Sequence, residues 1–346
     1  MKIYDNLSLL GRNTFGIDQS CDRLMEYENE NDAADAASEC RSTGHFLLLG
    51  GGSNLLLTQD FHGLIVTPAR RFEVCALPDA GDSDSVLVRC WAGTTFDDVV
   101  AYAVDNGYYG LENLSLIPGE CGASAVQNIG AYGAEIKDTL YRIEAVEIAT
   151  GQPVSIFNGE CQYSYRQSRF KGEWKDKFII TYVTYRLSKT FRPYLDYGNI
   201  RRVLDERHIF IDTLTARQLR DAVIDIRRQK LPDPAITGNA GSFFMNPIVD
   251  EATFKELQGQ HPDIRYFEVE CPDGSIHYKI PAGWMIDQCG WKGRSLGPAG
   301  VHDKQALVLV NRGGAKGSDI VALMHAIQKD VRDKFGIEIR PEVNVI

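Results

Sequence analysis

FLLLGGGSNLLL, residues 46–57, places Gly50, Gly51 and Gly52 between two short apolar runs. The apolar runs predict two buried strands, and the glycines predict the loop that joins them. This order differs from the strand, loop and helix of the usual dinucleotide fold. Main-chain N–H groups of glycines can approach a ligand closely, so the loop can cradle a pyrophosphate, with Ser53 and Asn54 adding side-chain hydrogen bonds. The alternative is a tight β-turn between two buried strands.

Size and composition indicate a multidomain globular protein. The chain has 346 residues, of which 44% are hydrophobic and 24% charged, so more than one core is expected. It contains neither a long apolar run nor the features of a secretory signal, so we expect a cytoplasmic protein with no membrane span. The formal net charge of −10 argues against general nucleic-acid binding. The eight cysteines form no CxxC pair and the seven histidines show no ligand spacing, so no metal site is expected.

Periodicity predicts alternating helices and strands along the chain. Thr215 and Gln218 form a capping box that begins a helix, which the LPDP at 231–234 ends. The polar and aromatic stretch 192–211 is expected to be an inserted excursion. Other helices are expected at 31–40, 95–106 and 318–335, and strands at 63–67, 86–93, 141–149, 178–187 and 306–310. The economical partition has three domains: 1–70, 71–210 and 211–346.

A second stretch rich in small residues follows the first glycine loop. GLENLSLIPG at 110–119 leads into GASAVQNIGAYG at 122–133. Extended backbone with small side chains, beside Gln127 and Asn128, can line a long flat ligand through main-chain groups. An isoalloxazine ring, with its alternating acceptors and one donor, is a ligand of that kind.

Three further segments hold candidate catalytic residues. GNAGSFFMNP at 238–247 presents Ser242 in a small-residue loop with a Phe pair that can anchor it, although a tight turn that enters a buried strand explains the same pattern. Arg166 lies in the basic stretch YRQSRFK, where a solvated surface charge or a structural ion pair is the alternative. Glu342 in PEV is near the C-terminus, where an exposed chain end is the alternative.

Eight motifs occur in a characteristic order: Asn13-Thr14-Phe15, LLLGGGSNLLLT, GLENLSLIPG, QNIGAYG, YRQSRFK, GNAGSFFMNP, PAGWMIDQCG and PEV. Together they cover essentially the whole chain, which resembles the UDP-N-acetylenolpyruvoylglucosamine reductase family, the UDP-N-acetylmuramate dehydrogenases of peptidoglycan precursor synthesis. The resemblance is to the longer subtype, which has a Tyr-bearing loop.

The resemblance implies an α+β fold. A two-part FAD-binding module of the vanillyl-alcohol-oxidase (PCMH) type would comprise 1–70 and 71–210, with the Tyr-bearing loop near 190–205. A C-terminal α+β substrate-binding domain would comprise 211–346. The resemblance also implies non-covalent FAD, NADPH as reductant and UDP-N-acetylglucosamine enolpyruvate as substrate. We expect a monomer.

The resemblance assigns residues by role. It makes Ser242 the proton donor, Arg166 the cation that offsets developing negative charge, and Glu342 the group that orients a water or the serine. The substrate-binding positions are Tyr197, Lys230, Asn246 and Gln305. For Lys230 a favourable interaction with a helix dipole is an alternative, and for Asn246 a role in a turn. The FAD-binding positions are Gly50, Gly51, Gly52, Ser53, Asn54, Gly119, Gly122, Ala123, Ser124, Gln127, Asn128 and Ile129.

Two departures from the family pattern and two competing functions remain. Met245 stands where relatives often carry lysine, and Ala125 where proline is common, which puts the affinity for nicotinamide in question. An FAD-linked oxidase that shares only the cofactor module is one alternative function. A nucleotide-sugar sensor without chemistry is the other. His45 is the nearest candidate for covalent flavin attachment, and we expect it to be a satisfied core histidine instead.

Overall fold

The computed structural model describes residues 1–271 and 273–346, which form two compact units. The first unit comprises Met1–Ser8, Ser20–Gly52 and Phe61–Gln229. The second comprises Leu9–Gln19, Ser53–Asp60 and Lys230–Ile346. The boundary falls inside the glycine loop, between Gly52 and Ser53. The three-domain partition of the sequence stays a prediction.

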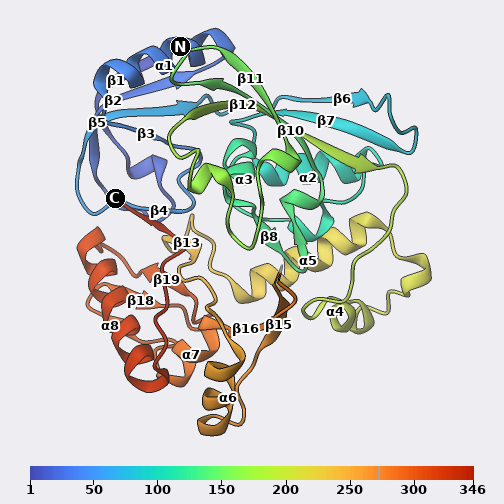
Figure 1. Cartoon of the computed structure of the whole chain (residues 1–346), viewed down its shortest axis with the longest axis vertical. Helices are drawn as coiled ribbons and strands as arrows, with labels where there is room; N and C mark the ends of the chain where they lie inside the picture. The colour runs from blue at the N-terminus through green and yellow to red at the C-terminus, as the bar shows by residue number, and fades with distance from the viewer. Residues whose placement is uncertain (272) are drawn as a thin grey trace. The chain divides into compact units, whose positions relative to one another are not determined.

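The first unit begins with a four-stranded sheet of order β1-β2-β5-β3 (Figure 1). β1 is antiparallel to β2, and β2, β5 and β3 run parallel. Their bounds are β1 Lys2–Ser8, β2 Ser20–Tyr27, β3 Phe46–Leu48 and β5 Phe61–Pro68. Helix α1 (Glu30–Thr43) is capped by the side chain of Asn29 and ends at Gly44, and it packs through buried alanines. These elements confirm the predicted helix at 31–40 and strand at 63–67.

A five-stranded antiparallel sheet of order β11-β10-β12-β7-β6 holds the main core of the first unit. One of its faces contributes Val88, Ile143 and Val183, and α2 and α3 pack there (Figure 1). The predicted strands at 86–93, 141–149 and 178–187 and the helix at 95–106 are confirmed. The bounds are β6 Val74–Pro78, β7 Ser85–Trp91, β10 Leu140–Glu147, β11 Pro153–Phe157, β12 Phe178–Ser188, α2 Phe96–Asp105 and α3 Cys121–Gln127.

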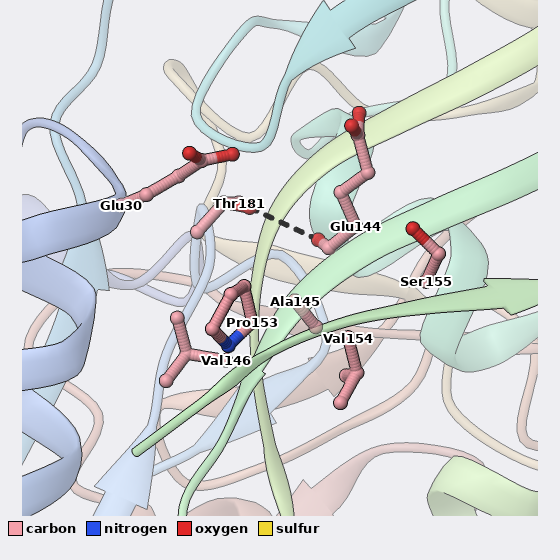
Figure 2. A pocket seen from close by; sticks show the side chains of 8 residues that line it. All are labelled: Glu30, Glu144, Ala145, Val146, Pro153, Val154, Ser155 and Thr181. Carbon is pink, nitrogen blue, oxygen red and sulfur yellow. Dashed lines mark hydrogen bonds between the residues drawn. The ribbon is translucent and has the colours of Figure 1, made fainter.

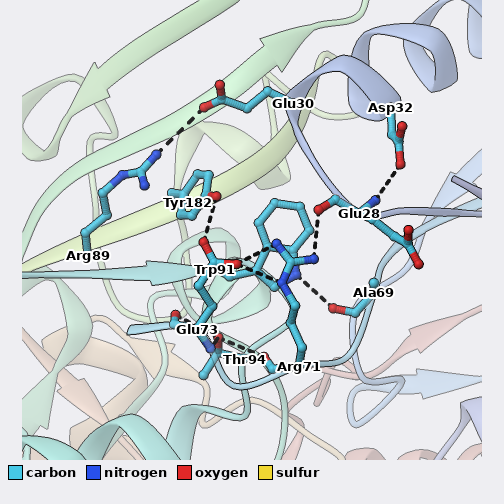
Figure 3. Close-up of polar contacts among 10 residues, drawn as sticks. All are labelled: Glu28, Glu30, Asp32, Ala69, Arg71, Glu73, Arg89, Trp91, Thr94 and Tyr182. Atoms are coloured by element: carbon cyan, nitrogen blue, oxygen red, sulfur yellow. Dashed lines mark hydrogen bonds and ion pairs between the residues drawn. The ribbon is translucent and has the colours of Figure 1, made fainter. Parts of the chain in front are cut away.

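The other face of this sheet packs Trp91, Val146 and Ile179 against α1, and beside them it carries stacked cation–aromatic pairs (Figure 3). The Arg71 guanidinium lies 4.0 Å from the centre of the Trp91 ring, and that of Arg89 lies 3.4 Å from the centre of the Tyr182 ring. Tyr182 donates to Glu73 at 2.8 Å, and the Trp91 indole donates to the carbonyl of Ala69 at 2.8 Å. These contacts fix the chain that follows β5.

The predicted excursion at 192–211 contains a helix, α4 (Ile200–Glu206). Apolar residues of α4 and of the preceding loop, including Leu195, form a buried cluster with α5 (Ala216–Lys230). The capping box at the start of α5 is confirmed, because the Thr215 N–H donates to Gln218 and the Gln218 N–H donates back to the Thr215 hydroxyl. The excursion is therefore anchored to α5 by its own small core.

The second unit contains a four-stranded sheet of order β13-β19-β18-β17 and a three-stranded sheet of order β14-β16-β15. Helix α8 (Gly317–Phe335) packs on the first of these sheets, which confirms the helix predicted at 318–335. The strand predicted at 306–310 begins only at Val308. The other bounds are β13 Asn239–Ser242, β14 Ile248–Val249, β15 Phe267–Glu270, β16 Ile276–Lys279, β17 Ser295–Leu296, β18 Ala299–Val301, β19 Val308–Asn311, α6 Glu251–Gln260 and α7 Ala282–Gln288.

The strands on either side of the glycine loop do not pair with each other. β3, before the loop, pairs with β5, whereas β4 (Leu55–Leu56), after it, pairs in parallel with β20 (Asn344–Val345) at the C-terminus. Short 3₁₀ helices lie at Leu10–Arg12, Glu112–Leu114, Ile136–Asp138, Asn158–Glu160, Arg169–Lys171 and Ile211–Thr213. Among the described residues, no helix is both long and apolar enough to cross a membrane.

Candidate functional site

The two small-residue stretches meet within the first unit. A Cβ built on Gly50 would lie 3.1 Å from the Cβ of Ala123, and one built on Gly51 would lie 3.4 Å from the Cα of Gly119. Residues separated by about 70 positions in the sequence are thus in van der Waals contact. The absence of side chains on the glycines permits this approach.

The glycine loop presents unused donors. The N–H groups of Gly50 and Gly51 meet no acceptor in the described part of the chain. Gly52 has a left-handed backbone, with φ of 67°, which turns the loop sharply. Consecutive main-chain N–H groups in a turn form a concavity that suits a phosphate group. The donor set therefore fits the pyrophosphate of a dinucleotide.

The prediction of extended backbone after Gly119 is wrong, because Cys121–Gln127 forms helix α3. The Gly122 N–H donates to Ala92 at 2.9 Å, and a Cβ on Gly122 would lie 3.0 Å from the Cβ of Ala92. The Ser124 hydroxyl donates to Cys121 at 2.7 Å and lies 2.9 Å from the Tyr185 hydroxyl. Gly122 and Ser124 therefore seat the helix on the sheet. Ala123 and Gln127 are partly exposed and remain free to face a ligand.

Asn128 ends α3 in the left-handed conformation, with φ of 46°. Its buried side chain donates to Glu135 and to the carbonyl of Ser164, and accepts from the Lys137 N–H. This amide is fully engaged within the protein, so it shapes the turn that follows. That turn leads through Ile129 to the hairpin of β8 (Gly130–Ala131) and β9 (Ala134–Glu135).

Arg166 lies against the same hairpin. Its guanidinium donates to the carbonyl of Gly130 at 2.8 Å and to that of Asn128 at 3.5 Å. It also lies 5.6 Å from the centre of the Tyr165 ring, and its backbone φ is 56°. Main-chain carbonyls thus fix a partly buried, planar cation, in contrast to a side chain solvated at the surface.

The sequence prediction missed a second guanidinium, that of Arg227 on α5. Its Nε donates to the carbonyl of Leu116 at 3.3 Å. Burial lowers the pKa of Arg227, Tyr132 and Asp97 oppose that shift, and Arg166 adds to it. Two arginine side chains therefore influence one another in this region. One feature of the sequence could have identified Arg227: it follows Val223 by four residues and so lies at the edge of the apolar face of α5.

In the second unit, Ser242 is the last residue of β13. It pairs with Val308, and the next residue, Phe243, donates its N–H to Leu307 at 2.7 Å. Gly241 has φ of 70°, and its N–H donates to the Asn239 side chain at 2.9 Å. Ser242 therefore lies at the irregular end of a strand, and its side chain is partly exposed.

The Phe pair anchors this strand, as predicted. Phe243 and Phe244 are almost completely buried, and the Phe243 ring packs edge-on against that of Phe15, with 6.2 Å between centroids. The Asn239 N–H donates to the carbonyl of Thr14 at 2.9 Å. The N-terminal Asn-Thr-Phe motif thus supports the strand that carries Ser242.

Glu342 is joined to the same strand. Its N–H donates to the carbonyl of Phe243 at 2.8 Å, and its own carbonyl accepts from the Asn54 side chain at 3.1 Å. The interpretation of Glu342 as an exposed chain end is wrong, because the residue is partly buried and held by main-chain bonds. The second unit therefore brings together the Ser242 strand, the PEV motif and the end of the glycine loop.

The predicted substrate-binding residues have different surroundings. Asn246 accepts the first N–H of α7, from Ala282 at 2.9 Å, and so helps to hold the start of that helix. The Gln305 side chain accepts from the Leu307 N–H at 3.3 Å. Lys230, the last residue of α5, is exposed, as is Tyr197 on the loop before α4.

His45 is not a core histidine. Its ring is exposed, stacks on Phe61 with 4.9 Å between centroids, and hydrogen-bonds the carbonyl of His62 at 2.7 Å. The prediction that it is satisfied is correct, and the prediction that it is buried is wrong. No cluster of metal-binding side chains exists among residues 1–271 and 273–346.

A hollow of about 280 Å³ lies in the first unit, and none of the predicted site residues lines it (Figure 2). Glu30 reaches into it from α1, and the other lining residues come from β10, β11 and β12 (Figure 2). Thr181 donates to the carbonyl of Glu144 at 3.1 Å within it. The hollow contains none of the candidate catalytic residues.

Comparisons with known proteins agree with this arrangement. Residues 233–346 match the C-terminal domain of UDP-N-acetylenolpyruvoylglucosamine reductase, and residues 22–156 match an FAD binding domain. The chain is 51% identical to the UDP-N-acetylenolpyruvoylglucosamine reductase of Bacteroides fragilis, over 98% of each chain. It is 46% identical to that of Burkholderia ambifaria, over 96% of this chain and 94% of the relative.

A solved structure shares the fold. The reductase from Thermus caldophilus, UDP-N-acetylenolpyruvylglucosamine reductase, superimposes with a TM-score of 0.68 over 100% of this chain and 99% of its own, at 22% identity. The expected α+β architecture, an FAD-binding module followed by a C-terminal α+β domain, is confirmed. On its similarity to the curated relatives over nearly its whole length, the chain belongs to the UDP-N-acetylenolpyruvoylglucosamine reductase family.

Proposed function

We propose that this protein reduces the enolpyruvyl ether of UDP-N-acetylglucosamine enolpyruvate to UDP-N-acetylmuramate, with NADPH as the reductant. The observation that carries the proposal is 51% identity over 98% of the chain with a reductase of that name. The catalytic candidates Ser242, Arg166 and Glu342 are all present, which favours an enzyme over a sensor. The reaction belongs to cytoplasmic peptidoglycan precursor synthesis, a pathway required for cell shape and division, and the proposed active form is a monomer.

The residues of the first unit fit bound FAD. The free N–H groups of Gly50 and Gly51 would hold its pyrophosphate, and the exposed edge of α3, with Ala123 and Gln127, would line its flat ring. Ser124 and Asn128 would act indirectly, since their side chains are engaged within the protein. When bound, FAD supplies the hydride for the terminal carbon of the enolpyruvyl group.

The protein supplies the proton and the countercharge. Negative charge develops on the carbon next to the hydride acceptor and on its carboxylate, and Arg166 offers a fixed planar cation for that charge. Ser242 donates a proton to the same carbon as a general acid. Glu342, held beside the Ser242 strand through Phe243, orients the serine or a water and helps to return the proton. Tyr197, Lys230, Asn246 and Gln305 bind the nucleotide sugar.

Two half-reactions test this function. The purified protein should be yellow, and NADPH should bleach its flavin under anaerobic conditions. UDP-N-acetylglucosamine enolpyruvate should then restore the oxidised spectrum. A colourless protein that takes up no FAD would rule out both the reductase and the FAD-linked oxidase. A reduced flavin that reoxidises only with oxygen would favour the FAD-linked oxidase.

The glycine loop gives a separate prediction for cofactor binding. Gly50→Val adds methyl groups where a Cβ already lies 3.1 Å from Ala123, so affinity for FAD should fall by about tenfold or more. FAD titration followed by flavin fluorescence measures this, with the unfolding temperature checked in parallel. Gly159→Val is the matched control, since nothing lies within 4 Å of a Cβ there. Normal FAD affinity in Gly50→Val would contradict the assignment of the loop.

A further inference from the structure

The Tyr-bearing loop and the β8–β9 hairpin of the first unit contact each other reciprocally. A Cβ on Gly133 of the hairpin would overlap Cε1 of Tyr194 and lie 3.1 Å from its Cδ1. A Cβ on Gly198 of the loop would lie 3.2 Å from Cδ1 of Tyr132. Each segment thus contributes one tyrosine ring and one glycine, and each ring covers the glycine of the other segment. Both glycines have positive φ, 82° and 71°.

One buried amide ties the two segments together. The Asn113 side-chain nitrogen donates to the carbonyl of Tyr132 at 2.9 Å and to that of Tyr194 at 3.0 Å. Asn113 is only 4% exposed, so water does not compete for these bonds. The packing of the two rings and the shared amide together form what we term the Tyr–Gly interlock, defined by Asn113, Tyr132, Gly133, Tyr194 and Gly198.

The interlock connects the loop to the arginines of the site. The hairpin begins at Gly130, whose carbonyl accepts from Arg166. Burial raises the pKa of the Tyr132 phenol, Arg227 opposes this shift, and Tyr197 adds to it. Tyr132 therefore lies within electrostatic range of both the loop tyrosine and a guanidinium. The loop is also secured next to Tyr194, because Leu195 is buried in the cluster with α5 and Tyr132 packs against the same cluster.

We propose that the Tyr–Gly interlock positions Tyr197 for the nucleoside diphosphate sugar, and that Gly133 and Asn113 are positioning residues for substrate binding. The inference rests on the proposed function and adds the device that holds the loop. The buried cluster holds the excursion through Leu195, and the interlock holds Tyr194 and Gly198, the residues on either side of Tyr197. Since Gly133 leaves no room for a side chain under the Tyr194 ring, its replacement must displace the loop.

Gly133→Ala tests the interlock in the FAD-loaded enzyme. Chymotryptic cleavage after Tyr197, measured without substrate, should become about tenfold faster because the loop opens more often. Affinity for UDP-N-acetylglucosamine enolpyruvate, followed by flavin absorbance, should weaken by about tenfold. FAD content and the turnover rate at saturating substrate should change little. Gly151→Ala is the matched control: its φ is 72°, and a Cβ there would be no closer than 3.5 Å to Arg41.

Tyr194→Ala keeps the test decisive if Gly133→Ala folds poorly. This variant removes the ring and leaves the backbone unchanged, so it should loosen the loop in the same two measurements. In the Tyr194→Ala background, Gly133→Ala should add little, because the two residues act through one contact. Additive effects of the two substitutions, or unchanged cleavage and affinity in both single variants, would overturn the interlock. Wild-type enzyme that fails to bind the nucleotide sugar would overturn the proposed function instead.

Discussion

Ser242→Ala should reduce its flavin with NADPH at nearly the normal rate, and should lose the reoxidation by the enolpyruvyl nucleotide sugar. General acids contribute about 10²–10⁴-fold to a rate, so the oxidative half-reaction should slow by that factor. We expect only proton donation to be affected, because Ser242 ends β13 with a partly exposed side chain. Its neighbours Phe243 and Phe244 are buried. Removal of the hydroxyl leaves the strand and the packing of both rings intact.

Stopped-flow absorbance of the flavin separates the two half-reactions of this variant. Ser318→Ala is the matched control, an exposed serine of the same unit whose side chain makes no hydrogen bond among the described residues. It should leave both rates unchanged. Ser242→Cys keeps a proton donor and should retain more activity than the alanine variant, which a purely structural role would not produce. Reoxidation of Ser242→Ala within a few-fold of wild type would remove Ser242 from the acid role.

Elements with strong periodicity could be predicted from the sequence. α1, α2, α5 and α8 show an apolar face, a cap or a stop glycine, and the structure confirms each of them. α3 could not be predicted in this way, since its small residues show no apolar periodicity. Its helical state depends on contact with a distant strand, where Gly122 packs against Ala92. Tertiary packing thus decides the structure of a segment whose local signals suggest a loop.

The sequence allowed the residues of the candidate site to be predicted, but it gave less information about the role of each residue. The glycine loop, Ser242 and Glu342 carry visible motifs, yet the pairing of β4 with β20 joins two-residue strands that are far apart in the sequence. Just beyond these strands, the Thr58 hydroxyl donates to the carbonyl of Ile346, 288 positions later. No local pattern encodes so distant a parallel pair. Ser124 and Asn128 look like ligand-binding polar residues, but their side chains satisfy partners inside the protein. Whether a polar side chain faces inward depends on its neighbours in space.

Arg166→Lys should keep the charge of the side chain and still slow the oxidative half-reaction by about 10²–10³-fold, the typical loss when one preorganised donor is removed. The guanidinium donates from two nitrogens at once, to Gly130 and to Asn128, and this fixes its plane. A lysine ammonium is a point charge on a flexible stem and cannot reproduce that fork. A rigid, oriented cation is needed because charge develops on both the carbon and its carboxylate.

Arg169→Lys is the control for Arg166→Lys, since Arg169 pairs with the exposed Glu173 at 2.6 Å and stacks on Trp174 at 3.9 Å. Flavin reduction by NADPH should be nearly normal in both variants, and only Arg166→Lys should be slow with the nucleotide sugar. An equal loss in both half-reactions would indicate a damaged flavin site, because Gly130 and Asn128 also shape the end of α3. A loss confined to substrate affinity would make Arg166 a binding residue. Only a slower reoxidation at saturating substrate would show that Arg166 stabilises the negative charge that develops during the reaction.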